Sequence, residues 1–226
     1  MALTMDYSDT TVIIPVMNEP AAGRVTKAVL RRLGNCKVIV IYRGDRKALG
    51  IDFTDKNLAV MEQKGRGKGA AVVQAAKKVG TKIMCLIDGD ATYEVEDLKK
   101  VIALVRDGAD MAIGNRFRDL DRKAMPFYIE IGNKVITETA NLLYGMRLAD
   151  SQTGLRAMRT EAFRSIRPKE KFFGIETEMD VKLRKTGCRI AETPIRYYER
   201  VGSSKQTKAL DGVKLLLIDF KFLFEN

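Results

Sequence analysis

Hydrophobic positions in the first half of the chain follow two alternating periods. Short apolar runs, each closed by glycine or a small polar residue, predict buried strands. These runs are Thr11–Val16, Lys37–Tyr42, Leu58–Met61, Ile83–Ile87 and Asp110–Gly114. Between them, apolar residues spaced three and four apart predict helices after Pro20, over Ala70–Lys78 and over Val95–Arg106. This alternation predicts an α/β fold, a mostly parallel, doubly wound sheet with helices on both faces.

The second half of the chain loses this rhythm. Arg118–Pro126 is polar and charged, which predicts a mobile surface loop. Helical spacing returns over Ile131–Tyr144 and Glu176–Lys185, and Leu155–Met158 is a short predicted strand. Arg189–Tyr198 contains a proline and is typical of an extended segment at a sheet edge.

The last stretch, Thr207–Asn226, predicts an amphipathic helix. Its expected apolar face comprises Leu210, Val213, Leu216, Leu217, Phe220, Leu223 and Phe224, and its polar face Asp211, Lys214, Lys221 and Glu225. Two interpretations stay open. The helix packs on its own domain, or it lies at a membrane interface or pairs with a partner.

Charge narrows the expected partners. The 226 residues include 40 Lys and Arg against 29 Asp and Glu, a net charge of +11. This excess favours an anionic partner, such as a phosphorylated substrate or an acidic membrane surface. No basic run marks a nucleic-acid arm, so nucleic acid is not an expected partner.

Missing residue types exclude several kinds of chemistry and compartment. Histidine is absent, which excludes Ser-His and Cys-His nucleophiles, HExxH metal sites and a histidine base. Cys36, Cys85 and Cys188 lie far apart in apolar sequence, which predicts reduced, buried thiols in a cytoplasmic protein. We expect neither a signal peptide nor a membrane span, because no apolar run approaches ~20 residues.

The chain's most suggestive chemistry follows the fourth predicted strand. There Asp88-Gly89-Asp90 places two carboxylates where open α/β sheets bind ligands. Such a pair suits Mg²⁺ or Mn²⁺, with the remaining positions left for phosphate oxygens. The alternative is that both acids only end the strand and cap the next helix.

Two further stretches carry candidate chemistry. In Lys64–Gly69 (KGRGKG), glycines such as Gly67 let backbone N–H groups approach an anion at a helix start. Neither common phosphate fingerprint fits, and a tight strand-to-helix turn explains the glycines equally well. Glu176, Glu178 and Asp180 stand early in a predicted helix, as catalytic acids or as partners of the helix dipole.

Seven segments, taken in order, resemble family 2 glycosyltransferases of the GT-A fold. They are Ile14–Pro20 (IPVMNEP), Gly65–Ala71 (GRGKGAA), Leu86–Tyr93 (LIDGDATY), Gly114–Phe117 (GNRF), Gly132–Lys134 with Asn141, Asp150–Met158 (DSQTGLRAM) and Arg189–Lys205 (RIAETPIRYYERVGSSK). Their spacing is similar to that of the dolichyl-phosphate mannose synthase branch and its archaeal relatives.

The resemblance implies a donor side. Pro15 and Glu19 would border the nucleotide base and ribose. Asp88 would contact the nucleotide or the metal, and Asp90 would hold Mg²⁺ or Mn²⁺ with the donor diphosphate. The closing loop over the diphosphate would comprise Arg200, Ser204 and Lys205.

The resemblance also implies an acceptor side, where Arg116 would face a phosphate and Glu176 or Glu178 would lie near the reaction centre. Three positions depart from the family. Tyr42-Arg43 stands where an acidic pair usually binds the nucleotide, so the donor base is left open. Thr92 replaces a frequent Gln, and Asn133 replaces a frequent basic residue.

The expected function is a metal-dependent inverting transfer of a hexose from a nucleotide sugar, such as GDP-mannose or a UDP-sugar, to dolichyl or another polyprenyl phosphate. A phosphate acceptor is already anionic and needs little help from a base. The protein would be peripheral at the cytoplasmic face of the membrane. Alternatives are a soluble acceptor, with a carboxylate base, or a non-catalytic scaffold subunit.

Domain organisation completes these expectations. We expect a transferase domain over 1–205, with a nucleotide half at about 11–115 and an acceptor half at about 116–205, followed by the helix of 206–226. The sequence leaves open a homo-oligomer and a separate membrane subunit.

Overall fold

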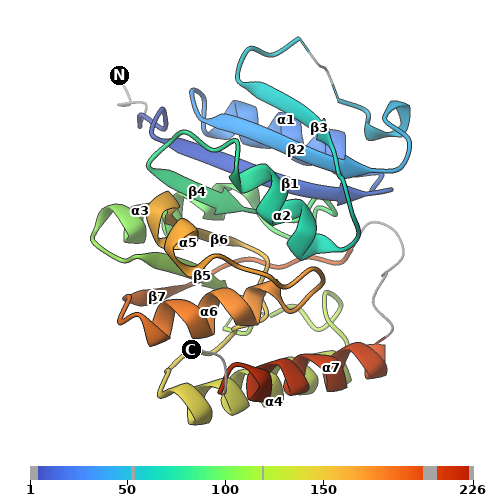
Figure 1. Ribbon diagram of the computed structural model, residues 1–226. Helices are drawn as coiled ribbons and strands as arrows, with labels where there is room; N and C mark the ends of the chain where they lie inside the picture. Colours follow the sequence, from blue (N-terminus) through green and yellow to red (C-terminus); the bar gives the residue numbers. More distant parts are fainter. Residues whose placement is uncertain (1–4, 52–53, 119, 201–207, 224–226) are drawn as a thin grey trace.

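The structure, a computed structural model, describes residues 5–51, 54–118, 120–200 and 208–223, with the backbone alone from 208 to 214. A seven-stranded sheet has the order β3-β2-β1-β4-β6-β5-β7 (Figure 1). The strands are β1 (Thr10–Met17), β2 (Lys37–Arg43), β3 (Leu58–Glu62), β4 (Ile83–Leu86), β5 (Met111–Asn115), β6 (Arg156–Arg159) and β7 (Ile190–Pro194). Strand β6 is antiparallel to its neighbours β4 and β5, and the other pairs are parallel. The predicted α/β class is confirmed.

Helices cover both faces of the sheet. They are α1 (Ala22–Arg32), α2 (Lys68–Ala76), α3 (Leu98–Arg106), α4 (Phe127–Tyr144), α5 (Thr160–Ile166), α6 (Ile175–Lys185) and α7 (Lys208–Lys221). In Figure 1, α1 and α3 lie behind the sheet, α2, α5 and α6 lie in front, and α4 and α7 run side by side beyond β7. Among the described helices, none is long and apolar enough to cross a membrane.

Two apolar cores follow from the alternation of side chains along the strands. On β1, Val12 and Ile14 join the core beneath α1 and α3. Ile13 faces the opposite core beneath α2 and α6, together with Met84 of β4 and Ile113 of β5. The central strands are buried on both faces, which explains their unbroken apolar runs.

Most element boundaries differ from the predictions by a few residues. Helix α2 begins two residues earlier than predicted and α4 begins four residues earlier, while the Val95–Arg106 helix opens with a 3-10 turn. Helix α5 was not predicted, because seven residues directly after a strand hold too few turns for a clear period. Strand β7 forms the sheet edge and contains Pro194, as expected.

The C-terminal helix packs through a different face from the one predicted. Leu215 and Asp219 of α7 are buried, as is Phe222 directly after it, and the helix contacts α4 and α6. Leu217, Phe220 and Leu223 are instead 63%, 49% and 40% exposed. Leu210, Val213, Phe224 and the polar residues Asp211, Lys214 and Glu225 lie outside the described side chains. Among the described residues of the predicted apolar face, Leu216 is half-buried and the other three are exposed.

The strand order places a topological switch point between β1 and β4. From β1 the chain moves outward through β2 and β3, and then returns to β4 on the other side of β1. Open α/β sheets bind ligands in the crevice that such a reversal leaves at the carboxyl ends of the strands. The ends of β1 and β4 carry Glu19 and Asp88, respectively, within a few residues.

Candidate active site

Asp88 and Asp90 leave β4 in a tight turn. Gly89 passes close to β1, where an added Cβ would lie 3.0 Å from Val16 Cγ2. Ala91 has a φ of 62°, a left-handed conformation that is strained for a residue with a side chain. Asp90 Oδ1 accepts hydrogen bonds from the backbone N–H and the hydroxyl of Thr92, at 3.1 and 2.8 Å. Asp90 thus closes its own turn.

The next helix is capped by a different residue. The side chain of Glu94 accepts a hydrogen bond from the backbone N–H of Glu96 at the start of the 3-10 turn. Neither Asp88 nor Asp90 is that cap, so the helix-capping interpretation of the two aspartates is wrong. Their carboxylates are available to face other groups.

A lysine ammonium lies between two of the acids. Lys68, the first residue of α2, is 2.6 Å from Asp88 Oδ1 and 2.7 Å from Glu176 Oε1. Burial opposes its charge, but the two carboxylates outweigh burial and raise the pKa of Lys68 above its usual value. The sequence analysis did not select this lysine, although it stands inside the glycine-rich stretch at a helix start.

A guanidinium joins the second aspartate to the end of β1. Arg200 Nη2 lies 2.7 Å from Glu19 Oε1, and its Nη1 lies 3.4 Å from Asp90 Oδ2. Burial raises the pKa of Asp90, and the nearby charge of Asp88 raises it further. Arg200, Glu19, Asp88 and Asp90, all predicted from the sequence, are therefore brought together.

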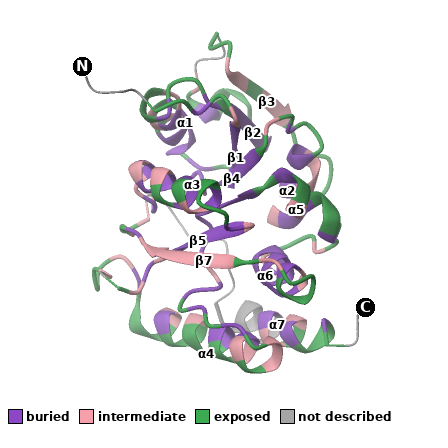
Figure 2. Cartoon of the chain, turned by 90° about the vertical axis from the view of Figure 1, so that its left-hand side faces the viewer, coloured by how far each residue is buried: buried purple, intermediate pink, exposed green. Residues whose placement is uncertain are grey.

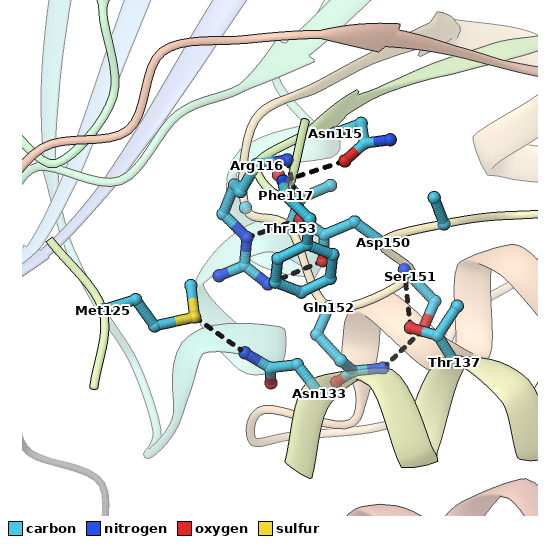
Figure 3. Close-up of polar contacts among 12 residues, drawn as sticks. Asn115, Arg116, Phe117, Met125, Asn133, Thr137, Asp150, Ser151, Gln152 and Thr153 are labelled. Atoms are coloured by element: carbon cyan, nitrogen blue, oxygen red, sulfur yellow. Dashed lines mark hydrogen bonds and ion pairs between the residues drawn. The ribbon is translucent and has the colours of Figure 1, made fainter. Parts of the chain in front are cut away.

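The loop from Asp150 to Gly154 connects two parts of the site. At Gly154 an added Cβ would lie 2.3 Å from Asp88 Oδ2, so only glycine allows this approach. The Gly154 N–H donates to the hydroxyl of Tyr93 at 2.7 Å. At the other end of the loop, buried Asp150 accepts from Arg116, through Nε at 2.6 Å and Nη2 at 2.7 Å (Figure 3).

Arg116 is held inside the protein next to aromatic rings. It is 6% exposed, and its guanidinium lies 5.6 Å from the Phe117 ring and 5.4 Å from the Tyr197 ring. Burial opposes its charge, but Asp150 outweighs burial and raises the pKa of Arg116. The Phe117 ring also contacts Lys134 of α4, whose ammonium lies 5.3 Å from the ring centre.

Asn133, which stands next to Lys134 and replaces a basic residue frequent in the family, lies near Arg116. Figure 3 shows its amide directed from α4 toward Met125, whose sulfur lies 3.7 Å away. Gln152 extends from the connecting loop toward α6, where it donates to Thr177 Oγ1 at 3.1 Å. The acceptor side predicted from Arg116 thus borders α4.

Glu176 and Glu178 face different surroundings. Residues two apart on a helix point to nearly opposite sides. Glu176 meets Lys68, whereas the fully buried carboxylate of Glu178 accepts from the backbone N–H groups of Lys169 and Glu170, the shortest contact being 2.6 Å. Lys182 also lies 2.6 Å from Glu178. The structure brings Glu176, and not Glu178, to the acids at β4.

The glycine-rich stretch is occupied by backbone contacts. Gly67, with a φ of 94°, precedes α2. The N–H groups of Gly69 and Ala70 donate to the carbonyl oxygens of Phe172 and Lys171, at 3.2 and 3.0 Å. At these two positions the structure favours the tight-turn interpretation over a phosphate-facing one.

Three of the remaining positions singled out in the sequence lie in β1 and β2. Pro15 is half-buried in β1. Tyr42 is buried in β2, while Arg43 donates from Nη1 to the carbonyl of Gly65 at 2.6 Å. The departure from the usual acidic pair therefore ties β2 to the glycine-rich stretch. Ser204 and Lys205 lie outside the described residues.

The carboxylates at the end of β4 fit a divalent cation. Within the described part of the chain, no group of three or more His, Cys, Asp or Glu side chains gathers as a metal site. Mg²⁺ characteristically takes only one or two protein carboxylates and completes its shell with phosphates and water. Burial first, and then the charge of Asp88, raise the pKa of Asp90, and a bound cation would offset both effects.

Comparisons with known proteins agree with this architecture. The family model described as Glycosyl transferase family 2 matches residues 11–167. The chain is 31% identical over 194 residues to the "Glycosyltransferase AglJ" of Haloferax volcanii, covering 85% of this chain and 64% of that protein. It is 30% identical over 201 residues to the "Dolichyl-phosphate hexose transferase" of the same organism, covering 88% and 87%.

Relatives of different length also match. The chain spans 53% of the "Low-salt glycan biosynthesis hexosyltransferase Agl6" of Haloferax volcanii, so it covers only about half to two thirds of some curated relatives. The "UDP-N-acetylglucosamine--dolichyl-phosphate N-acetylglucosaminyltransferase" of Methanococcus voltae is 27% identical over 71% of this chain and 67% of its own length.

Among solved structures, glucosyl-3-phosphoglycerate synthase from Mycobacterium tuberculosis, in complex with Mn²⁺, uridine diphosphate and phosphoglyceric acid, superposes with a TM-score of 0.72. The match covers 94% of this chain and 77% of that one, at 15% identity, and it shows a shared fold. On the strength of the family match, the chain belongs to glycosyl transferase family 2.

Proposed function

We propose that this protein is a glycosyltransferase that moves a hexose from a nucleotide sugar to a polyprenyl phosphate of the dolichyl class. One observation carries the proposal: a single loop, Asp150–Gly154, joins the acids at β4 to the buried Arg116 beside α4. The proposed donor site and the arginine proposed to face the acceptor phosphate would thus be connected by one short loop. Relatives named for transfer to dolichyl phosphate support this acceptor.

The donor side would receive a nucleoside diphosphate and a divalent cation. Asp88 and Asp90 are the residues that would hold Mg²⁺ or Mn²⁺, which supplies positive charge to the departing diphosphate. Lys68 and Arg200 already lie within 3.4 Å of these carboxylates and add two protein cations there. The solved neighbours with Mn²⁺ or Mg²⁺ and uridine diphosphate support this arrangement.

The acceptor side would align an anionic nucleophile. Arg116 and Lys134 would offset the charge of the lipid phosphate, so that two anions can approach each other. A phosphate oxygen attacks C1 of the sugar from the face opposite the diphosphate. The new C1–O bond forms as the old one breaks, and the nucleoside diphosphate leaves with the electron pair. This inverting step requires no histidine and no strong base.

The membrane face of the protein would be formed by α4 and α7. Figure 2 shows exposed stretches on both helices. The exposed apolar side chains are Phe127, Tyr128, Ile131, Val135 and Leu142 on α4, Leu217 and Phe220 on α7, and Leu223 just after α7. The exposed basic residues Arg122, Lys123 and Lys134 accompany them, and the chain's net charge is +11. Apolar side chains flanked by cations are typical of helices that lie in the interface of an anionic membrane.

This placement extends to the domain and compartment proposals. Residues 1–205 would form the transferase domain, and 206–226 would add the membrane-facing helix. Cys36 and Cys85 are buried free thiols and Cys188 is a half-buried one, which suits the reducing cytoplasm. We therefore place the protein at the cytoplasmic membrane face.

Nucleotide binding provides the first test. Unfolding temperature would be measured with GDP, UDP and CDP, each with and without Mn²⁺, since ligands that bind the folded state raise its stability. We expect a metal-dependent rise with one nucleotide, which identifies the donor base. No rise with any nucleotide would contradict the donor site and favour a non-catalytic scaffold subunit.

Acceptor identity and membrane binding form the second test. Sugar transfer would be compared between polyprenyl phosphate in anionic vesicles and soluble phosphoglycerate, and we expect product only with the lipid. Phe220→Glu should weaken vesicle binding by ~10-fold by placing a charge on the interfacial face. Met5→Glu is the control, because Met5 is also exposed, at 62% against 49% for Phe220, but lies outside α4 and α7. Transfer to the soluble acceptor alone would overturn the lipid assignment.

A further inference from the structure

The segment of residues 168–174, which joins α5 to α6, lies against the first turn of α2. Its carbonyl oxygens at Lys171 and Phe172 accept from the N–H groups of Ala70 and Gly69. The two backbones approach so closely that Gly67 and Gly69 have no room for a side chain. An added Cβ at Gly67 would lie 2.1 Å from the carbonyl oxygen of Lys171, and the corresponding distance for Gly69 is also 2.1 Å, to Glu170. These glycines thus let two backbone segments pack directly together.

Glu178 holds the same segment from the other side. Its buried carboxylate accepts from the backbone N–H of Lys169 at 2.9 Å and of Glu170 at 2.6 Å. A carboxylate that accepts two backbone N–H groups fixes a segment strongly, because charge-assisted hydrogen bonds are about twice as strong as neutral ones. The 168–174 segment is therefore fixed between α6 and α2.

What this arrangement positions is Lys68. The residue stands between the two glycines that contact the segment, and its ammonium reaches Asp88 and Glu176. We propose that Glu178 is a positioning residue for the donor site, acting through the 168–174 segment on the backbone of Lys68. This inference rests on the proposed donor site, and it gives Glu178 a role without contact to the reacting atoms.

Helix α7 contacts the same segment. Lys221 Nζ lies 2.6 Å from Glu170 Oε1. At Gly174 an added Cβ would lie 2.4 Å from Cδ1 of Ile218, so the helix packs closely on the segment's end. The segment thus touches the proposed membrane-facing helix on one side and the donor-site helix on the other.

The experiment uses Glu178→Gln, with Lys182→Met as the matched control. Glutamine replaces an acceptor oxygen with a donor NH₂ group, whereas the control removes the ammonium partner and leaves both backbone hydrogen bonds. Amide exchange at Gly69 and Ala70 would become ~10-fold faster in Glu178→Gln and stay unchanged in Lys182→Met. Affinity for the nucleoside diphosphate with Mn²⁺ should fall ~5- to 10-fold in Glu178→Gln alone.

A double mutant separates positioning from general destabilisation. If Glu178 acts through Lys68, adding Glu178→Gln to Lys68→Met should cause no further loss of nucleotide affinity, because the two changes remove one effect. Additive losses would overturn the proposal, as would unchanged exchange at Gly69 and Ala70. If Glu178→Gln does not fold, Glu178→Asp replaces it, with the same exchange and affinity changes expected in smaller size.

Failure of the proposed function and failure of the Glu178 proposal would give different results. Wild-type protein that binds no nucleoside diphosphate would contradict the donor site. The exchange rates of Gly69 and Ala70 would still report whether Glu178 holds the segment against α2.

Discussion

Two pairs of acids, each two residues apart, behave differently in this molecule. Asp88 and Asp90 leave a strand through a tight turn, and each meets a cation, Lys68 and Arg200 respectively. Glu176 and Glu178 stand in the first turn of a helix, and only Glu176 meets Lys68. The backbone that carries a pair, and not its spacing, decides whether two carboxylates act together.

The largest effect is expected at the strand pair. Asp90→Asn should lower kcat by ~10³-fold or more, because it removes a carboxylate proposed to hold the cation that stabilises the leaving diphosphate. Steady-state turnover measures this change, and circular dichroism checks that the fold is kept. Thr92→Val is the control, since it removes one hydrogen bond to Asp90 but keeps its charge. Substantial turnover by Asp90→Asn would show that the strand pair does not work as a unit.

A smaller effect on turnover should distinguish Glu176 from Glu178 on α6. Glu176→Gln is expected to lower kcat by ~10- to 100-fold, since it removes a charge from the proposed reaction centre itself. Glu178→Gln should instead act mainly on nucleotide affinity. Measuring kcat and donor KM for both variants tests the distinction. If both variants changed kcat and KM equally, the proposed difference between Glu176 and Glu178 would be wrong.

The smallest effect concerns a buried acid for which the described part of the chain provides no cation partner. The carboxylate oxygens of Asp219 are buried and have no hydrogen-bond partner among the described residues. Burial, and then the charge of Asp180, raise the pKa of Asp219 to about 7 from 3.8. The folded state therefore holds this proton between about pH 4 and 7 while the unfolded state releases it, so stability falls as pH rises through that range.

Asp219→Asn should remove this loss. We expect the variant to be about 1–3 kcal/mol more stable than the wild type at pH 8 and equally stable below pH ~4, as measured by urea unfolding. Burial also raises the pKa of Asp180 to about 7, against the opposing charge of Arg156, and this residue titrates in both proteins. A pH-independent difference between the two proteins would contradict the assignment.

Local features of the site were predictable from the sequence. Asp88 and Asp90 directly follow an apolar run, so their position at a strand end needs only neighbouring residues. Glu19 and Arg200 required the family resemblance, because 181 positions separate the partners of this hydrogen bond. Lys68 was missed because both of its carboxylates lie far along the chain, and a lysine at a helix start carries no signal of its own.

Other failures arose from packing that no pattern records. The face of α7 was wrongly assigned because a buried aspartate, Asp219, lies on the packed side, whereas exposed Leu217 and Phe220 lie on the other. The direction of β6 was not predicted, since an apolar run reads the same for a parallel or an antiparallel strand. Glu176 and Glu178 could not be separated because helical spacing gives two opposite directions without saying which one meets the sheet.

The antiparallel strand has a consequence for how the protein is made. Strand β4 ends at Leu86, yet its neighbour β6 begins only at Arg156, and β5 joins the sheet through β6. During synthesis one edge of β4 therefore has no native partner until the ribosome has added the next 70 or so residues. Pairings so distant along the chain form slowly, and an open apolar edge invites association with other chains. Strand β6, which directly follows the Asp150–Gly154 loop of the site, is thus the element that covers the open edge of β4.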